Sequence, residues 1–439
     1  MLPLGQHVST DHQQHRLRTL WLTGVLHGFT HLYQLALTPL YLYIQKDLGL
    51  DNVGQATLLV TVMGAAYFLP SYPIGTLADR WSRKKLLAVG LAINSTGFIC
   101  LSLSHGYGAA IACVLLSGLG GSFYHPAATA LIARLFPEAR GKALGWVGVG
   151  ASIGFFAGPI YSGWRAVATG NWRAPVLELG IFGLVASILF AWLADEEKVD
   201  VDLGKQDPTT AISGAGKTSV QLFPNPKLWL IFLAACFAFS LRDFAGNAMP
   251  TSASLFLQKA HGFSPGTTGW ALSVIYLSSA ISNPLFGRMS DGGRGRWAGG
   301  VLLASALLVG IFARVPVAWM LPVLTAYGFF FMASYPITEA ALMEAVPDAV
   351  RGRIFGLFMT IAGLFGNFAH WIIGAWIGHL GDKANHPESY QTLYTLLALL
   401  VVGSISGLPF LKAIHRNEDK VAASSLLAVV VTQPEVPMA

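Results

Sequence analysis

The chain has 439 residues, of which 54% are hydrophobic and only 11% are charged, and its mean hydropathy is +0.55. These values exclude an ordinary soluble domain and indicate a membrane protein. The net charge of +6 does not indicate a nucleic-acid partner, because the cations are sorted by loop and are not gathered in one basic segment.

Twelve apolar segments are long enough to cross a bilayer, since a spanning helix needs about 20 residues. They cover residues 19–45, 54–79, 84–104, 107–134, 141–168, 173–194, 227–258, 266–290, 297–314, 317–345, 351–380 and 389–415. The segments lack the alternation of barrel strands, so helices must satisfy the backbone within the lipid. We therefore expect an all-α integral membrane protein.

The distribution of Lys and Arg predicts the topology. With twelve spans, both termini and the loops that follow even-numbered spans share one side of the membrane. That side holds 21 of the 28 Lys and Arg residues, 6 lie on the other side, and Arg242 lies inside a span. Because positive loops stay in the cytoplasm, we expect both termini to be cytoplasmic. The expected location is the plasma membrane, which is the inner membrane in a Gram-negative bacterium.

The first span carries a polar stripe. Its members are spaced 4, 3 and 4 residues apart and therefore share one helix face; they are His27, His31, Gln34 and Thr38. We interpret the stripe as the lining of a wet cavity. The alternative is that these groups form hydrogen bonds that hold neighbouring helices together.

The second span ends in a sequence that occurs twice. GTLADRWSRKK begins at Gly75 and GRMSDGGRGR begins at Gly287, 212 residues later (287 minus 75). Such a repeat indicates a duplicated unit. We expect two pseudo-symmetric six-helix bundles, over residues 1–194 and 227–420. A flexible cytoplasmic linker is expected over residues 195–226 and a cytoplasmic tail over residues 421–439.

The first copy resembles the signature loop of the major facilitator superfamily, a family of twelve-helix transporters. The matching residues are Gly75, Leu77, Asp79, Arg80, Arg83 and Lys84, whereas Ser82 stands where the family usually has Gly. The resemblance implies that Asp79 contacts the start of the eleventh helix and latches the two halves on the cytoplasmic side. The second copy adds Asp291 and Arg294 to the expected latch.

The fourth span contains Pro126, which cannot donate to the carbonyl of Ser122 and should loosen the helix beside His125. The FYHPAA stretch around His125, taken with His27, resembles the fosmidomycin-resistance-like branch of drug efflux transporters. Drug antiporters of the superfamily usually carry an Arg in this helix where Val114 stands here. If the protein exchanges protons, another group must therefore carry them. A buried structural role is the alternative for His125.

The fifth span is rich in glycine. The spacing of Gly145, Gly154, Gly158 and Pro159 is similar to the helix 5 signature of proton-coupled antiporters. Gly150, Gly154 and Gly158 recur every fourth residue and form a smooth ridge. We expect another helix to pack closely on this ridge and to slide along it.

The seventh span places Asp243 and Asn247 on one face and has Arg242 beside them, near the middle of the membrane. Ionisable groups there cost about 2.5 to 3.5 kcal/mol and are usually functional. The alternative is a static ion pair, although neighbouring helix residues point about 100° apart and need not pair. The tenth span adds Tyr327, Thr338 and Glu339. For His370 in the eleventh span we favour a structural role.

On the fourth span Ser117, Gly121, His125 and Thr129 recur every fourth residue. Polar stripes thus occur on the first, fourth, seventh and tenth spans, and the resemblance implies that these four line a central cavity. We expect an alternating-access transporter that exports a small organic solute in exchange for protons, with Asp243 as the first candidate for the proton carrier, the histidines next and Glu339 last. The alternatives are proton-coupled uptake of an organic anion and a receptor without transport. We expect a monomer in the lipid bilayer, with no enzymatic activity, cofactor, metal site or nucleic-acid partner.

Overall fold

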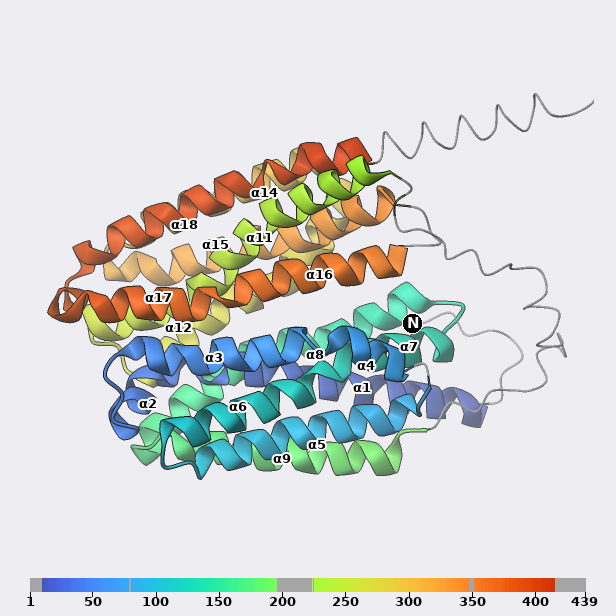
Figure 1. The fold of residues 1–439 in the computed structure, drawn as a ribbon, viewed down its shortest axis with the longest axis horizontal. Helices are drawn as coiled ribbons and strands as arrows, with labels where there is room; N and C mark the ends of the chain where they lie inside the picture. The colour runs from blue at the N-terminus through green and yellow to red at the C-terminus, as the bar shows by residue number, and fades with distance from the viewer. Residues whose placement is uncertain (1–9, 79, 196–222, 224, 347–350, 415–439) are drawn as a thin grey trace, which may run out of the picture.

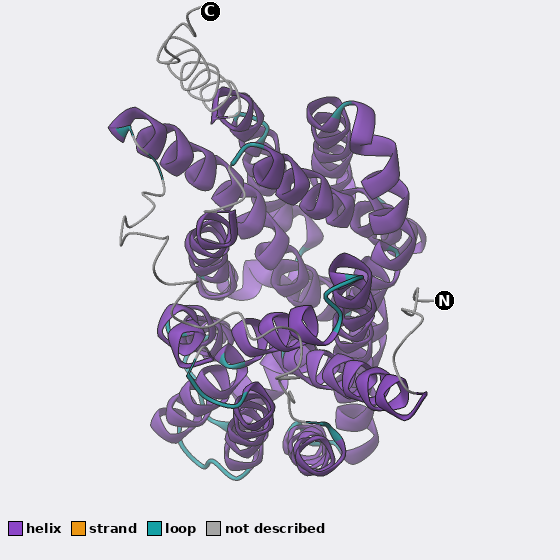
Figure 2. Cartoon of the chain, turned by 90° about the vertical axis from the view of Figure 1, so that its right-hand side faces the viewer, coloured by secondary structure: helices purple, strands orange, loops and turns teal. Residues whose placement is uncertain are grey.

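The computed structural model describes residues 10–78, 80–195, 223, 225–346 and 351–414. Every secondary-structure element in these ranges is a helix, as the view along the molecule in Figure 2 shows. The first half (residues 10–195) consists of α1 (Thr10–Ala36), η1 (Thr38–Leu40), α2 (Tyr41–Asp47), α3 (Val53–Phe68), α4 (Ser71–Ala78), α5 (Arg83–Ser102), α6 (Tyr107–Ser122), α7 (Tyr124–Leu135), α8 (Arg140–Thr169) and α9 (Arg173–Leu193).

The second half (residues 225–414) repeats this pattern. It consists of α11 (Pro226–Leu255), η2 (Phe256–Ala260), α12 (Pro265–Leu277), α13 (Ser279–Met289), η3 (Ser290–Gly292), α14 (Arg294–Phe312), α15 (Val317–Glu344), α16 (Arg351–Asn367), α17 (Ala369–His379), η4 (Gly381–Asn385), η5 (Pro387–Tyr390) and α18 (Gln391–Ser404).

Several of the predicted spans consist of two helical pieces. Within the described residues, nine helices are long and apolar enough to cross a membrane. The other three spans are α1 with η1 and α2, α3 with α4, and α12 with α13. Proline accounts for some of the breaks, because it removes a backbone donor. As predicted, the fourth span breaks at Phe123, between α6 and α7, where Pro126 cannot bond to Ser122.

The two halves form separate bundles that touch at one end. In Figure 1 the bundles lie one above the other and diverge toward the end that holds the start of α1 and the end of the twelfth span. We call this the proximal end and the opposite end the distal end. The closest contacts between the bundles pair α8 with α12 and α3 with α17.

Hydrogen bonds join the halves in their distal parts. Ser254 in α11 donates to the carbonyl of Thr38 (2.7 Å), and Ser273 in α12 donates to the carbonyl of Phe156 in α8 (2.6 Å). Further toward the middle, the Asn367 amide donates to the carbonyl of Thr61 in α3 (2.6 Å). Each of these bonds gives a polar side chain a partner that lipid could not provide.

Glycines let the backbones of the two halves touch. A Cβ atom added to Gly269 in α12 would lie 2.1 Å from the carbonyl oxygen of Pro159 in α8, and one added to Gly163 would lie 2.2 Å from that of Pro265. Real Cβ atoms do not approach so closely, so only glycine fits at either position. Small residues of this kind are what allow helices to associate in lipid.

The ends of the predicted linker are held to the bundles. Asp195, just after α9, accepts hydrogen bonds from Arg18 (3.0 Å) and His15 (3.1 Å) at the start of α1. Partial burial acts to raise the pKa of Asp195, but these bonds outweigh it and hold the pKa below its usual value. Phe223 is buried against Trp229 and Phe232 of α11. Asp195 and Phe223, near the two ends of the predicted linker, therefore contact the bundles, while residues 196–222 of that linker and the predicted tail over residues 421–439 lie outside the described residues.

We predict that Gly269→Leu opens the distal end, because the new side chain must displace the backbone at Pro159. Spin labels at two exposed distal positions, His105 and Lys383, measure the separation of the halves by pulsed electron paramagnetic resonance. We expect the distribution to shift to longer distances. Gly148→Leu in α8 is the control, since nothing lies within 4 Å of a Cβ there. An unchanged distribution in a well-folded Gly269→Leu protein would contradict this prediction.

Candidate functional site

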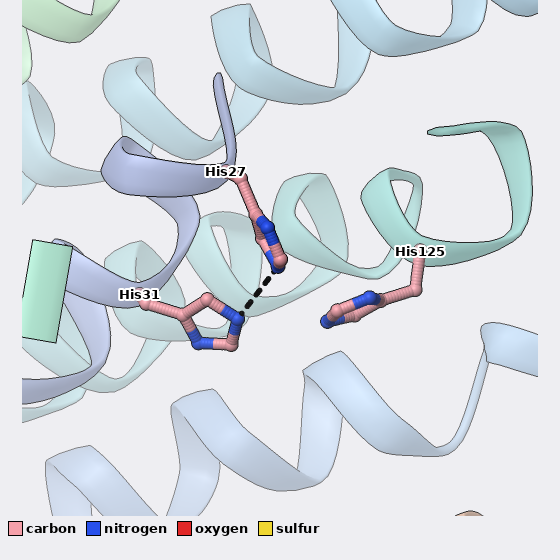
Figure 3. Close-up of side chains that lie close together, drawn as sticks. All are labelled: His27, His31 and His125. Atoms are coloured by element: carbon pink, nitrogen blue, oxygen red, sulfur yellow. Dashed lines mark hydrogen bonds between the residues drawn. The ribbon is translucent and has the colours of Figure 1, made fainter. Parts of the chain in front are cut away.

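Three histidines from two helices of the first half lie together (Figure 3). His27 and His31 lie about one turn apart on α1, and their Nε2 atoms are 3.0 Å apart. His125 on α7 points toward both, with ring centroids 5.2 Å from His27 and 5.6 Å from His31. The break at Phe123 presents His125 to this cluster, so the proline-dependent irregularity positions a polar side chain.

Hydrogen bonds orient the rings of the α1 pair. Nδ1 of His27 lies 2.9 Å from the carbonyl oxygen of Val147 in α8, and because a carbonyl can only accept, this nitrogen carries the hydrogen. In the neutral ring Nε2 of His27 then accepts from Nε2 of His31. Nδ1 of His31 lies 2.9 Å from the amide oxygen of Gln34. The outer nitrogens are thus occupied, and both Nε2 atoms face the same point.

Aromatic rings pack around the cluster and reach the other half. Tyr124 stacks on His27 with ring centroids 4.6 Å apart, and the ring centroid of Phe155 in α8 lies 4.3 Å from that of His31. Phe155 in turn stacks on Tyr276 of α12, with centroids 4.9 Å apart. The cluster therefore lies near the surface that the first half presents to the second.

The second half places a buried ion pair at the corresponding helix. Arg242 and Asp243, which are 1% and 7% exposed, bind each other directly, with Nη2 2.7 Å and Nε 2.8 Å from Oδ1. Nη1 of Arg242 donates to Thr338 Oγ1 at 2.6 Å. The guanidinium also lies 4.0 Å from the ring centroid of Tyr335, a cation–π contact. The direct pair forms although neighbouring helix residues point apart, because the long Arg side chain bends back to the carboxylate.

Glu339 on α15 adds a second carboxyl to this group. It is half-buried and lies close enough to Arg242 and Asp243 to interact with both electrostatically. The group of Arg242, Asp243 and Glu339 therefore contains one cation and two acids. Asn247 donates to the backbone carbonyl of Asp243 one turn earlier in its own helix, at 2.9 Å.

Two predicted cavity residues have other surroundings. Thr38 is fully buried in the distal contact, where its carbonyl accepts from Ser254, so in this conformation it lies between the halves. Tyr327 is 1% exposed and is packed on Phe331, with ring centroids 4.9 Å apart. His370 is also buried, and its Nδ1 lies 2.7 Å from Thr251 Oγ1, which fits the structural role that we favour for it.

Comparison with known proteins decides the family. The sequence profile of the Major Facilitator Superfamily matches residues 20–245 and 235–428, which together cover most of the chain. The chain belongs to the Major Facilitator Superfamily. This finding confirms the family and the twelve-helix fold that the sequence predicts.

Individual proteins of known sequence resemble the chain only distantly. The quinolone resistance protein NorA of Staphylococcus aureus is 26% identical over 228 residues, which is 52% of this chain and 54% of NorA. An uncharacterized MFS-type transporter of Mycobacterium tuberculosis is 34% identical over 140 residues, which is 30% of this chain and 24% of that protein. The match therefore spans about half the length of NorA and less of the second relative.

Among solved structures, a bacterial homologue of the human lysosomal transporter Spinster, in an inward-facing and unoccupied conformation, superposes with a TM-score of 0.69. The superposition covers 93% of this chain and 97% of that chain at 16% identity. At this identity the likeness concerns the fold.

The superfamily signature loop contains a helix cap in this member. Asp79 lies outside the described residues, and Arg80 next to it is exposed. Ser82 has φ of −60° and caps α5 by accepting from the backbone N–H of Lys85 at 3.3 Å. The departure from the usual Gly therefore causes no strain, since this turn needs no positive φ. Arg83 is 7% exposed, while Lys84 is half-buried and Gly75 lies in ordinary contact with Pro126.

The second copy of the signature loop makes contacts within its own half. Arg294 at the start of α14 binds Asp291 at 3.2 Å and Glu344 at the end of α15 at 2.6 Å. In this conformation Asp291 and Arg294 therefore brace α14 against α15 and do not join the two halves through these bonds.

The glycine ridge of α8 packs on α1 of the same half. Added Cβ atoms at Gly154 and Gly158 would lie 2.0 Å from the carbonyl oxygen of Gly28 and 2.7 Å from that of Leu32. Gly145 has nothing within 4 Å and belongs to no such contact. The ridge is thus an interface inside one bundle, whereas the contact between bundles uses Pro159 and the glycines named above.

Sequence reasoning missed several residues of these sites. Tyr335 precedes Glu339 by four residues on α15, a spacing that places both on one face and would have suggested a common site. Glu344 and Asn367 carry no comparable signal, because their partners lie on other helices far away in the sequence.

We predict that Arg242→Met lowers the free energy of unfolding by about 3 to 5 kcal/mol, because it leaves buried carboxyls without their counter-charge. Adding Asp243→Leu should restore much of this loss. Denaturant titration in mixed micelles measures the free energy of unfolding of the single and the double variant. Arg314→Met, at an exposed position, serves as a control whose stability should change little. Equal stability of Arg242→Met and the unsubstituted protein would show that the pair contributes little.

Proposed function

We propose that the chain is a secondary transporter that exports a small organic solute in exchange for protons. The observation that carries this proposal is the group of Arg242, Asp243 and Glu339, which holds two acids and one cation inside a membrane helix bundle. A net negative charge is costly in this environment, so the group favours binding one proton. Similarity to NorA supports efflux of a drug-like solute.

The proposed orientation follows the distribution of Lys and Arg, which places the proximal end in the cytoplasm. The halves contact each other in their distal parts and diverge proximally, so the structure would be the state that loads from the cytoplasm. Export then requires the distal contact to open and the proximal ends to close. The latch proposed from the signature loop, Asp79 with Arg83, would stabilise the closed proximal end.

One proton per cycle is enough to drive accumulation. Moving a unit charge through 100 mV releases about 2.3 kcal/mol, and each 1.4 kcal/mol corresponds to a factor of about ten. One proton therefore sustains a gradient of roughly fifty-fold.

Uptake of an organic anion bound by Arg242 has less support. The guanidinium already donates through all three of its nitrogens, to Asp243 and to Thr338. An anion would have to replace a carboxylate at 2.7 Å, which is costly for a buried charge pair.

We predict that Asp243→Asn and Glu339→Gln each abolish proton-driven accumulation while substrate binding remains. Either change leaves one cation and one acid, so the group is neutral and has no excess charge for a proton to cancel. Because no unbalanced charge is left buried, both proteins should fold. Substrate-driven proton flux is measured in proteoliposomes with an imposed pH gradient, over a panel that begins with quinolones.

The matched control is Glu178→Gln, since Glu178 is also a carboxylate in a membrane helix and is paired with Arg165. It should retain coupling because it lies in α9, away from the proposed site. Undiminished coupled flux in both Asp243→Asn and Glu339→Gln would remove these residues from the mechanism.

We also predict that Arg83→Ala slows transport and changes substrate affinity by no more than a few-fold. Arg83 is buried at the start of α5, near the proximal helix ends, where it would bias the closing step without touching substrate. Lys85→Ala, at an exposed neighbouring position, is the control. Loss of binding in Arg83→Ala, with normal interconversion of the two states, would contradict the latch.

A further inference from the structure

The three histidines have the donor arrangement of a metal site. One nitrogen from each of His27, His31 and His125 can be chosen so that all three atoms lie within 4.8 Å of one another. Figure 3 shows the rings converging from α1 and α7. The sequence predicts no metal site because His125 is 94 residues beyond His31 (125 minus 31) and only the fold brings it to the pair.

The outer nitrogens of the α1 pair are held in the way that metal-binding histidines require. A ligand histidine usually donates its second N–H to a carbonyl or carboxylate, which fixes the ring and raises its basicity. His27 has this bond to the Val147 carbonyl at 2.9 Å. Nδ1 of His31 lies 2.9 Å from the Gln34 amide oxygen and would donate to it once Nε2 of His31 gives up its hydrogen to bind the metal. Both rings therefore present Nε2 inward with the orientation already set.

We propose that His27, His31 and His125 bind one divalent transition-metal ion of the Zn²⁺ type. Zinc lies about 2.0 to 2.1 Å from imidazole nitrogen, so nitrogens in a tetrahedral site are about 3.3 Å apart. The Nε2 atoms of His27 and His31, at 3.0 Å, are already near this separation. The metal would replace the hydrogen bond between them.

His125 has to move closer by at most about 1.5 Å to complete the site. Its side chain is exposed, and it lies two residues after the helix break at Phe123, so rotation of the ring meets little resistance. The donor set contains imidazoles and no carboxylate, which favours Zn²⁺, Co²⁺, Ni²⁺ or Cu²⁺ over Mg²⁺ and Ca²⁺.

Three protein ligands leave a fourth position open. Tyr67 contacts His125 edge-on, with ring centroids 6.1 Å apart, and its buried hydroxyl has no hydrogen-bond partner among the described residues. A water or a carboxylate oxygen on the metal would give that hydroxyl an acceptor. The ion would add positive charge to a set of neutral rings, and so suits a cargo with an anionic or chelating oxygen. Only this statement about cargo rests on the proposed function.

Direct metal binding tests the site. The full chain, purified with a histidine-free tag and stripped with a chelator, is placed in lipid nanodiscs and titrated with Zn²⁺ by calorimetry and with Co²⁺ by visible absorption. We expect one ion per chain and the Co²⁺ spectrum of a four-coordinate site with three nitrogen ligands. His31→Ala and His125→Ala should each lower the affinity by more than about 100-fold, and Gln34→Leu by about 10- to 100-fold, because Gln34 only orients a ligand.

Two histidines outside the cluster are the controls. His370→Gln replaces a buried histidine and His386→Gln an exposed one, and both variants should retain the site. Thermal unfolding in the presence of chelator checks that each variant is folded. If His125→Ala is not folded, His125→Gln replaces it as the more conservative substitution. Unchanged affinity in the His31→Ala/His125→Ala protein, or binding without one-to-one stoichiometry, would mean an adventitious ion only. No transport is measured, so failure of the proposed function leaves the result intact.

Discussion

The structure depends on backbone contact between α8 and α12 in the distal part of the molecule. Lipid is as apolar as the helix surfaces, so hydrophobic burial does not drive the halves together and close packing must do so. Gly269 against Pro159 and Gly163 against Pro265 provide that packing because neither glycine has a Cβ. A contact in the distal part leaves the proximal ends of the two halves free to separate, which is the geometry that alternating access requires.

The two halves of a duplicated fold carry different chemistry. On α1 and α7 the first half holds three histidines, whereas on α11 and α15 the second half holds Arg242 with two carboxyls. Inside a membrane each charge must be neutralised by a partner or by a proton. The proposed roles follow this difference, with a proton at the group that has excess acid and a metal ion at the three histidines.

Helix irregularity places polar groups in this protein. Pro126 interrupts the fourth span, and the interruption turns His125 toward the histidines of α1. In contrast, the regular glycine ridge of α8 serves to pack α1 within its own bundle. Regular segments thus build the two rigid bodies, and a break next to a proline builds a site on the face between them.

The sequence by itself determined the membrane class, the twelve spans, the duplication and the superfamily, because hydropathy, helical spacing and a repeated loop are properties of short segments. It also identified the helices that carry polar stripes. Periodicity tells which residues share a face of a helix, but not what that face meets. Only the tertiary structure decided that Arg242 pairs with Asp243, that Thr38 is buried between the halves and that His125 joins His27 and His31. These outcomes depend on how helices distant in sequence cross and how long side chains bend, and no local pattern records either.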